Sequence, residues 1–170
     1  MDRLSLFDRS CLDSAERMAK TALYQYRNLP VGCVIALDEH IIGQGGNAVL
    51  HPCYAPIRHA EMEAIQSVPP EFWPRAHQMT LYTSLEPCIM CLSTIILHGI
   101  GRVVYGACDT KGGGTTILKS LPPYYQHGGI PQLIGPVDPE RFDKYYDLTA
   151  RMFDDLPCAV KNERIFMGCR

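Results

Sequence analysis

Two short segments of the chain carry side chains that bind metal ions. One is His59-Ala60-Glu61, and the other is Pro87-Cys88-Ile89-Met90-Cys91. Cysteines three residues apart on a helix lie on one face, so Cys88 and Cys91 can hold a single ion. The unpaired N–H groups and positive dipole end at a helix N-terminus favour the thiolate, which is the form that binds metal. With His59 as the third ligand, the set suits Zn²⁺ and leaves one tetrahedral position open for water.

Glu61 follows His59 by two residues, and inside a helix this separation points two side chains to roughly opposite faces. Both can reach one site only if His59 lies at the start of the helix, which the loop-like sequence Pro56-Ile57-Arg58 permits. A carboxylate beside zinc-activated water can act first as a general base and then as a general acid. The two segments therefore predict metal-assisted hydrolysis, with Glu61 as the catalytic residue and His59, Cys88 and Cys91 as the zinc ligands.

A structural zinc site and a redox dithiol are the competing interpretations. A non-catalytic structural zinc site needs a fourth protein ligand. The candidates for that ligand are Cys33, Cys53, Cys108, His51 and His98. A thiol oxidoreductase would hold no zinc and would form a reversible disulfide between Cys88 and Cys91, but it leaves His59 and Glu61 unexplained. The joint occurrence of both segments, each at the start of a predicted helix, favours the catalytic site.

Helices and strands are predicted to alternate around these segments. The predicted helices span residues 11–26, 59–68 and 88–97 and a segment that starts at Asp138, and the predicted strands span 31–37, 79–84 and 102–107, the first forming a hairpin with the segment from Ile41 to Gly46. The helix at 88–97 is apolar nearly all round, so we expect it to be buried. The strand, helix and strand over residues 79–107 favour parallel pairing through a right-handed crossover. Together these elements predict a layered α/β fold with a mixed sheet.

Residues 108–138 are rich in glycine and proline and are predicted to be mainly loop, a candidate lid with one short helical segment at 115–121. Only 32 residues follow Asp138, which is too few for an independent core. We therefore expect one domain over residues 1–170, with its core at about 11–153 and a C-terminal extension at 154–170.

Composition excludes several classes of protein. The chain has 170 residues and a net charge of −2, with 16 Lys and Arg against 18 Asp and Glu, so a strongly basic nucleic-acid binder is excluded. The first residues, Met1 to Arg9, are charged where a signal peptide is apolar, so the eight cysteines are expected to be thiols in a cytoplasmic protein. The longest apolar run, near Ile95-Ile96-Leu97, is too short to cross a bilayer, and no membrane partner is expected.

The sequence resembles the cytidine deaminase superfamily of zinc-dependent nucleobase deaminases, whose signature is His-x-Glu followed by Pro-Cys-x-x-Cys. Within it, the chain is similar to the bacterial tRNA adenosine deaminases from about residue 29 to residue 153. The matching segments are Leu29 to Val34, Gly46-Asn47, Thr83 to Cys91 and Ile100 to Gly112. The segment from Thr83 to Cys91 is the most specific of the four, because it contains the zinc helix.

The resemblance implies a three-layer α/β/α sandwich with a central five-stranded mixed sheet, one Zn²⁺ and a homodimer. It implies hydrolytic deamination, in which water adds to the ring carbon that bears the exocyclic amine and Glu61 carries the proton to the ring nitrogen and then to the leaving group. It also implies substrate contacts from Asn47, from Val31 in the pocket wall and from Asp109 near the ribose.

Two kinds of substrate remain open. The motifs favour a tRNA adenosine, converted to inosine. The alternative is a free base, nucleoside or nucleotide of the guanine, cytosine, cytidine or deoxycytidylate type, favoured by the neutral surface and by Arg58, which stands directly before His59 where the tRNA enzymes usually have a small residue. Residues 138–170 carry six Lys and Arg and seven Asp and Glu, a net charge of −1, where a tRNA enzyme is expected to be basic.

Overall fold

A computed structural model describes residues 4–127 and 129–154 of the chain. Its central sheet has the strand order β2-β1-β3-β4-β5. The strands are β1 (Gly32–Leu37), β2 (His40–Gly46), β3 (Thr80–Leu85), β4 (Arg102–Ala107) and β5 (Gln132–Ile134). Strand β1 pairs antiparallel with β2 and β3, whereas β3, β4 and β5 are parallel. The prediction of a five-stranded mixed sheet is confirmed.

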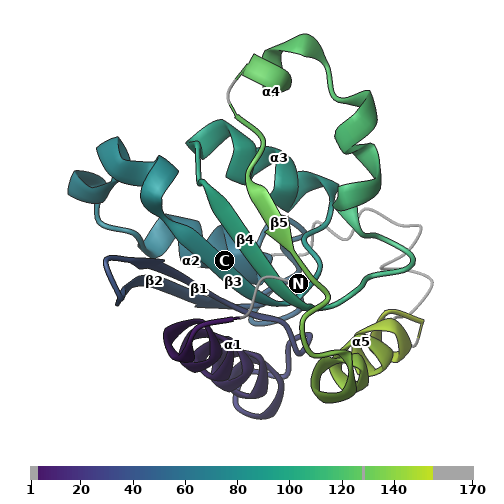
Figure 1. Cartoon of the computed structure of the whole chain (residues 1–170). Coiled ribbons are helices and arrows are strands. Elements are labelled where there is room, and N and C mark those ends of the chain that lie inside the picture. The colour runs from purple at the N-terminus through teal and green to yellow at the C-terminus, as the bar shows by residue number, and fades with distance from the viewer. Residues whose placement is uncertain (1–3, 128, 155–170) are drawn as a thin grey trace.

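Helices cover both faces of this sheet and complete a three-layer α/β/α sandwich (Figure 1). Helices α1 (Leu6–Tyr24) and α5 (Pro139–Asp154) lie on one face, and α2 (Ala60–Ser67) and α3 (Ile89–His98) lie on the other. Three short helical segments, η1 (Pro70–Gln78), η2 (Gly114–Ser120) and α4 (Pro123–His127), complete the described chain. None of the described helices is both long and apolar enough to span a membrane.

The glycines of β2 allow α2 to pack closely on the sheet. A Cβ at Gly45 would lie 2.5 Å from the backbone nitrogen of Ala64, and one at Gly43 would lie 2.8 Å from the carbonyl oxygen of the same residue. The predicted hairpin is confirmed, with Asp38 and Glu39 in the turn at positive φ. Because α2 begins directly after His59, the close packing of α2 on β2 fixes the distance of His59 from the sheet.

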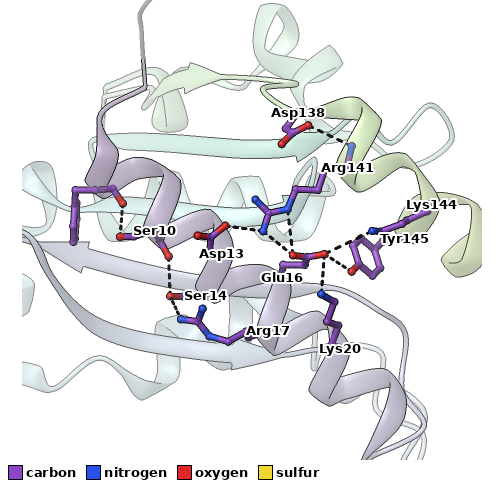
Figure 2. A network of polar contacts seen from close by, with 11 residues as sticks. Ser10, Asp13, Ser14, Glu16, Arg17, Lys20, Asp138, Arg141, Lys144 and Tyr145 are labelled. Atoms are coloured by element: carbon purple, nitrogen blue, oxygen red, sulfur yellow. Dashed lines mark hydrogen bonds and ion pairs between the residues drawn. The ribbon is translucent and has the colours of Figure 1, made fainter.

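Helix α1 is tied to α5 by a buried carboxylate. Figure 2 shows Glu16 of α1 accepting hydrogen bonds from Arg141 Nη2 at 2.6 Å and from Tyr145 Oη at 2.5 Å, while Arg141 also pairs with Asp13 at 2.7 Å. Burial opposes ionisation of Glu16, but the bonds from Tyr145, Arg141 and Lys20 outweigh it and lower the pKa of this carboxyl to about 2. The network therefore docks α5 against α1 on one face of the sheet.

Three sequence expectations need correction. Helix α1 begins at Leu6 and not at residue 11, because the Ser5 hydroxyl accepts from the Asp8 backbone N–H while the Asp8 side chain accepts from the Ser5 backbone N–H. The segment 108–138 contains a strand, β5, besides η2 and α4. Helix α3 is not buried all round, since Ile89 and Leu97 are 52% and 53% exposed.

The expectation that all eight cysteines are thiols is also wrong, because Cys53 forms a disulfide. The pairing of cysteines cannot be deduced from their spacing alone. The described cysteines that remain free are Cys11, Cys33, Cys88, Cys91 and Cys108. Residues 155–170, which make up nearly all of the expected C-terminal extension, lie outside the described part of the chain.

Sheet topology brings the candidate residues to one end of the molecule. Strand β1 runs antiparallel to β3, so the start of β1 lies beside the end of β3, where the Gly32 N–H donates to the Ser84 hydroxyl at 3.1 Å. Strand β2 ends at the same place as β1 starts, and β4 ends beside β3. The segments that hold Val31, Asn47, Cys88 and Asp109 therefore meet at one edge of the sheet.

Candidate metal and catalytic site

The three predicted metal ligands come together at two helix starts. His59 is the residue before α2 and Cys88 is the residue before α3, and both have extended backbones with ψ of 156° and 172°. Neither side chain caps its own helix, so both are available to the site. Cys88 Sγ lies 3.5 Å from His59 Nδ1 and 3.6 Å from Cys91 Sγ. The prediction that His59 stands at the helix start is confirmed.

These distances fit a zinc ion. With Zn–S of about 2.3 Å and Zn–N of about 2.0–2.1 Å, a tetrahedral site separates two sulfurs by about 3.8 Å and a sulfur from a nitrogen by about 3.6 Å. The ligand atoms of His59, Cys88 and Cys91 all lie within 4.8 Å of one another, and they form the one such group of three or more metal-binding side chains in the described residues. The five candidates named for a fourth ligand, Cys33, Cys53, Cys108, His51 and His98, are all described and are all outside this group. A Cys₂His set with an open position is typical of catalytic zinc.

The thiols at this site have strongly perturbed acidities. A hydrogen bond from the Cys91 thiol lowers the pKa of Cys88 to about 4, with His59 adding to the effect and burial opposing it. The Cys88 thiolate holds the Cys91 proton, and burial acts in the same direction, so the pKa of Cys91 is raised. Burial lowers the pKa of His59, but Cys88 and the Glu61 carboxylate outweigh it and raise the pKa. Cys88 is therefore a thiolate at neutral pH, which is the form of a cysteine that binds a metal cation.

Glu61 is buried against the ligand set. It is 3% exposed, its Oε2 lies 3.5 Å from Cys91 Sγ, and its Oε1 accepts a hydrogen bond from the Thr83 hydroxyl at 3.2 Å. Burial raises the pKa of the Glu61 carboxyl, and the charge of His59 offsets part of this effect. A carboxyl group with a raised pKa, in contact with a member of the ligand set, is suited to accept and return a proton.

Val31 and Asn47 lie side by side at the start of β1. The Asn47 N–H donates to the Val31 carbonyl at 2.9 Å, and both residues are buried. The Asn47 side-chain oxygen accepts from the Val49 N–H at 3.1 Å. Ala48, the next residue, donates to the carbonyl of Arg58 at 2.9 Å, so Asn47 is joined to the chain immediately before His59.

Arg58 is held away from the ligand set by a neighbouring acid. Its Nε and Nη2 donate to the two carboxylate oxygens of Glu63 at 3.0 Å and 2.8 Å. The Glu63 carboxylate raises the pKa of Arg58, so the guanidinium stays charged, and its charge is balanced by that carboxylate. Both residues line a cavity of about 930 Å³ between α1, β2 and α2, which Asn47 also borders. Arg58 is therefore part of a wall and not a free cation beside the zinc ligand.

Asp109 lies in the loop after β4, whereas Asn47 follows β2, and these two strands lie on opposite sides of β3 in the sheet. Its Oδ1 accepts from the N–H groups of Lys111 and Gly112 at 3.0 Å and 2.8 Å, so the carboxylate shapes its own loop. The Asp109 N–H donates to Glu86 Oε2 at 3.1 Å.

Two polar residues of the site were not identified from the sequence. Thr83 and Glu86 are 0% and 7% exposed, although threonine and glutamate are usually exposed. The signal that could have found them is their position. Thr83 falls within a strand that leads directly to the cysteines, and Glu86 stands between that strand and Pro87.

The fold and the site define a class of protein. A layered α/β sheet with a Cys₂His set and a buried glutamate two residues after the histidine is the arrangement of the zinc-dependent nucleobase deaminases. A model of the cytidine and deoxycytidylate deaminase zinc-binding region matches residues 6–107, and the chain belongs to this family.

Individual relatives agree with this assignment. The tRNA-specific adenosine deaminase of Streptococcus pyogenes serotype M18 is 38% identical over 128 residues, which are 71% of this chain and 73% of the relative. A structure from a study of A-to-I editing by tRNA:A34 deaminases is 28% identical, with a TM-score of 0.63 over 74% of this chain and 96% of that one. Guanine deaminase from Bacillus subtilis is 31% identical, with a TM-score of 0.54 over 65% of this chain and 74% of that one. The predicted resemblance is confirmed, and the chain is a deaminase, a hydrolase of C–N bonds.

Proposed function

We propose that this protein converts adenosine to inosine in tRNA by zinc-dependent hydrolytic deamination. The observation that carries the chemistry is the three-ligand set with the buried Glu61 carboxylate directly beside it. The similarity to tRNA-specific adenosine deaminases, which extends over most of the chain, supports the substrate.

In this proposal His59, Cys88 and Cys91 hold Zn²⁺, and Glu61 moves the protons. Bound zinc would lower the pKa of water towards about 7, so that a nucleophile is available at neutral pH. Glu61 accepts one proton of the attacking water and delivers it to the ring nitrogen. It then takes the remaining proton from the hydroxyl on the ring carbon and passes it to the amine, which departs as ammonia. The Thr83 hydroxyl holds Glu61 Oε1 during these transfers, leaving Oε2 facing the ligand set.

The residues around the site are assigned to substrate. Asn47, whose oxygen is already engaged by Val49, would present its NH₂ group to an acceptor on the base. Val31 would form part of the apolar wall. Asp109, in the loop after β4, would meet the ribose.

A free purine base is the second candidate substrate, and α5 provides the reason. Arg141 and Lys144 are directed at Glu16 of α1, so two of the cations on α5 are engaged within the protein. A helix in that state contributes little to neutralising phosphates, which supply much of the affinity for nucleic acid. The similarity to a guanine deaminase favours the same candidate.

An ammonia-release panel on zinc-loaded protein tests both candidates. The substrates are a tRNA anticodon stem-loop, adenosine, guanine, cytosine, cytidine and deoxycytidylate, each at low and high salt. The proposal expects turnover of the stem-loop with KM rising steeply with salt. Turnover of guanine alone, independent of salt, would replace tRNA with a free base, and no ammonia from any of them would contradict deamination of these bases.

We further propose a single cytoplasmic domain that forms a homodimer. Ile89 and Leu97, at the two ends of α3, are both about half exposed, so this helix leaves two apolar side chains open to a partner. A second copy of the chain is the expected cover, and light scattering after size exclusion should give twice the mass of the chain. A monomeric mass at micromolar concentration would contradict this expectation.

A further inference from the structure

The loop from Asp109 to Thr115 packs directly on the start of the zinc helix. The Gly114 N–H donates to the Pro87 carbonyl at 2.8 Å, and Cys88 and Gly113 form an isolated β-bridge. The loop is closed on itself by the Gly113 N–H, which donates to the Asp109 carbonyl at 2.9 Å. A displacement of this loop would therefore displace the backbone of Cys88 as well.

The buried carboxylate of Glu86 accepts hydrogen bonds from both ends of this loop. Glu86 Oε2 accepts from the Asp109 N–H at 3.1 Å, and Oε1 accepts from the Thr115 N–H at 3.2 Å and from the Thr115 hydroxyl. All three partners are donors, which satisfies an acceptor-only group, and the side chain is 7% exposed. The Glu86 backbone N–H donates to the Ala107 carbonyl at 2.8 Å, so the carboxylate stands on the paired ends of β3 and β4.

The run of three glycines in the loop fits around this carboxylate. A Cβ at Gly113 would lie 2.5 Å from Glu86 Cδ, and a Cβ at Gly114 would lie 2.8 Å from the backbone carbon of Cys88. Side chains at these positions would push the loop away from Glu86 and from the helix. The glycines therefore allow the loop to pack closely against Glu86 and the start of α3.

The outer side of the loop is fastened to the C-terminal helix. The Thr110 hydroxyl and the Tyr146 hydroxyl are 2.6 Å apart, which joins the loop to α5. The loop thus has a buried attachment at Glu86 and an exposed one at Tyr146. Only the buried attachment reaches both Asp109 and Thr115.

We propose that Glu86 is a positioning residue that fixes the loop carrying Asp109 relative to Cys88, so that the wall of the substrate site keeps its distance from the metal ligands. Glu86 does not touch the reacting atoms in this assignment. The effect on substrate rests on the function proposed above, whereas the effect on the loop does not.

Three variants of the full-length protein test the proposal. Glu86→Gln keeps the shape of the side chain but turns one acceptor into a donor that faces another donor. Thr115→Val removes one hydroxyl from the same contact and keeps the backbone N–H, and Thr115→Ser restores that hydroxyl. Glu71→Gln on η1, an exposed acid away from the site, is the control.

Hydrogen exchange, zinc content and steady-state kinetics are measured on each variant. Glu86→Gln and Thr115→Val should speed amide exchange in residues 108–116 by about 10-fold to 100-fold, with Thr115→Ser and the control near wild type. Zinc should stay at one ion per chain. KM for whichever substrate the ammonia panel identifies should rise about 10-fold, while kcat stays within about 3-fold.

Two results would overturn the proposal. One is unchanged exchange in residues 108–116, or equal acceleration throughout the protein, which would mean that Glu86 does not hold this loop. The other is faster loop exchange with an unchanged KM, which would mean that the loop is not part of the substrate wall. If the wild-type protein deaminates no tested base, the proposed function fails, and the exchange measurement still decides whether Glu86 positions the loop. If Glu86→Gln does not fold, the Thr115 pair carries the same test.

Discussion

Replacing Glu61 with glutamine removes proton transfer from the site and leaves its shape. The amide oxygen can still accept from the Thr83 hydroxyl, which bonds Oε1 at 3.2 Å in the wild-type protein. The metal ligands His59, Cys88 and Cys91 are unchanged. The variant therefore separates the chemistry of Glu61 from the integrity of the zinc set.

The expected loss of activity follows from what Glu61 does and how deeply it lies. General acid–base catalysis contributes about 10²-fold to 10⁴-fold, which is about 2.7–5.5 kcal/mol of transition-state stabilisation. Glu61 carries the proton in two successive transfers and is 3% exposed, so bulk water is a poor substitute. We therefore expect the upper part of that range, a fall in kcat of about 10³-fold to 10⁴-fold with KM nearly unchanged. The free energy of unfolding should change by less than about 1 kcal/mol, because the amide avoids the burial of a charge.

The assay is ammonia release at saturating substrate, with zinc counted on the same preparation. Glu71→Gln is the control for loss of a carboxylate outside the site. A Glu61→Gln protein that holds one zinc per chain and retains more than a tenth of the wild-type kcat would refute the assignment of Glu61 as proton carrier.

Three further predictions concern stability and metal. Because the pKa of Glu16 falls from an ordinary 4.5 to about 2 on folding, its carboxylate contributes about 3 kcal/mol that is fully present above pH 4.5 and is lost as the pH falls towards 2. In urea titrations the difference in unfolding free energy between wild type and Glu16→Gln should shrink by that amount over this window, and a constant difference would contradict it. Gly45→Ala should lower stability by about 1–3 kcal/mol and weaken zinc binding, since its Cβ would lie 2.5 Å from the backbone of α2. Gly99→Ala, which has open space around it but a φ of 73°, should cost about 1–2 kcal/mol and leave zinc affinity unchanged, and equal zinc loss in both glycine variants would refute the distinction. Chelation should abolish ammonia release and lower the melting temperature, with both restored by added zinc, and a melting temperature insensitive to the chelator would show that the metal does not bind the folded site.

The position of the metal ligands was predictable because the spacing of His59 and Glu61 allows only one local arrangement in which both side chains reach one site. His59 and Glu61 are two residues apart, and a helix containing both would point them in opposite directions. The conflict has one local solution, with His59 outside the helix, and the structure adopts it. The Pro-Cys-x-x-Cys segment is equally local, since both sulfurs belong to one helical turn.

Strand β5 and the role of Glu86 were not predictable in the same way, because both depend on partners that are distant in sequence. Strand β5 has three residues in a segment rich in glycine and proline, and it is a strand because its backbone pairs with Arg102 to Val104 of β4. Glu86 has no local reason to be buried. Its partners, Asp109 and Thr115, are 23 and 29 residues away, and they reach it only because β3 and β4 end side by side.

The attachment of α5 to α1 limits which cations can contact the phosphates of a tRNA substrate. Arg141 donates two hydrogen bonds to the buried Glu16 carboxylate, which also accepts from Tyr145, so turning Arg141 outward to a phosphate would break part of the network that docks α5. The proposed substrate contacts Asn47 and Asp109 lie instead at the end of the sheet, in the loops after β2 and β4. A base pocket at that end can take a splayed-out base or a free base alike, so phosphate contacts, measured by the salt dependence of KM, distinguish the two substrates. Since Arg141 and Lys144 are engaged within the protein, a steep salt dependence would have to come from cations other than these two.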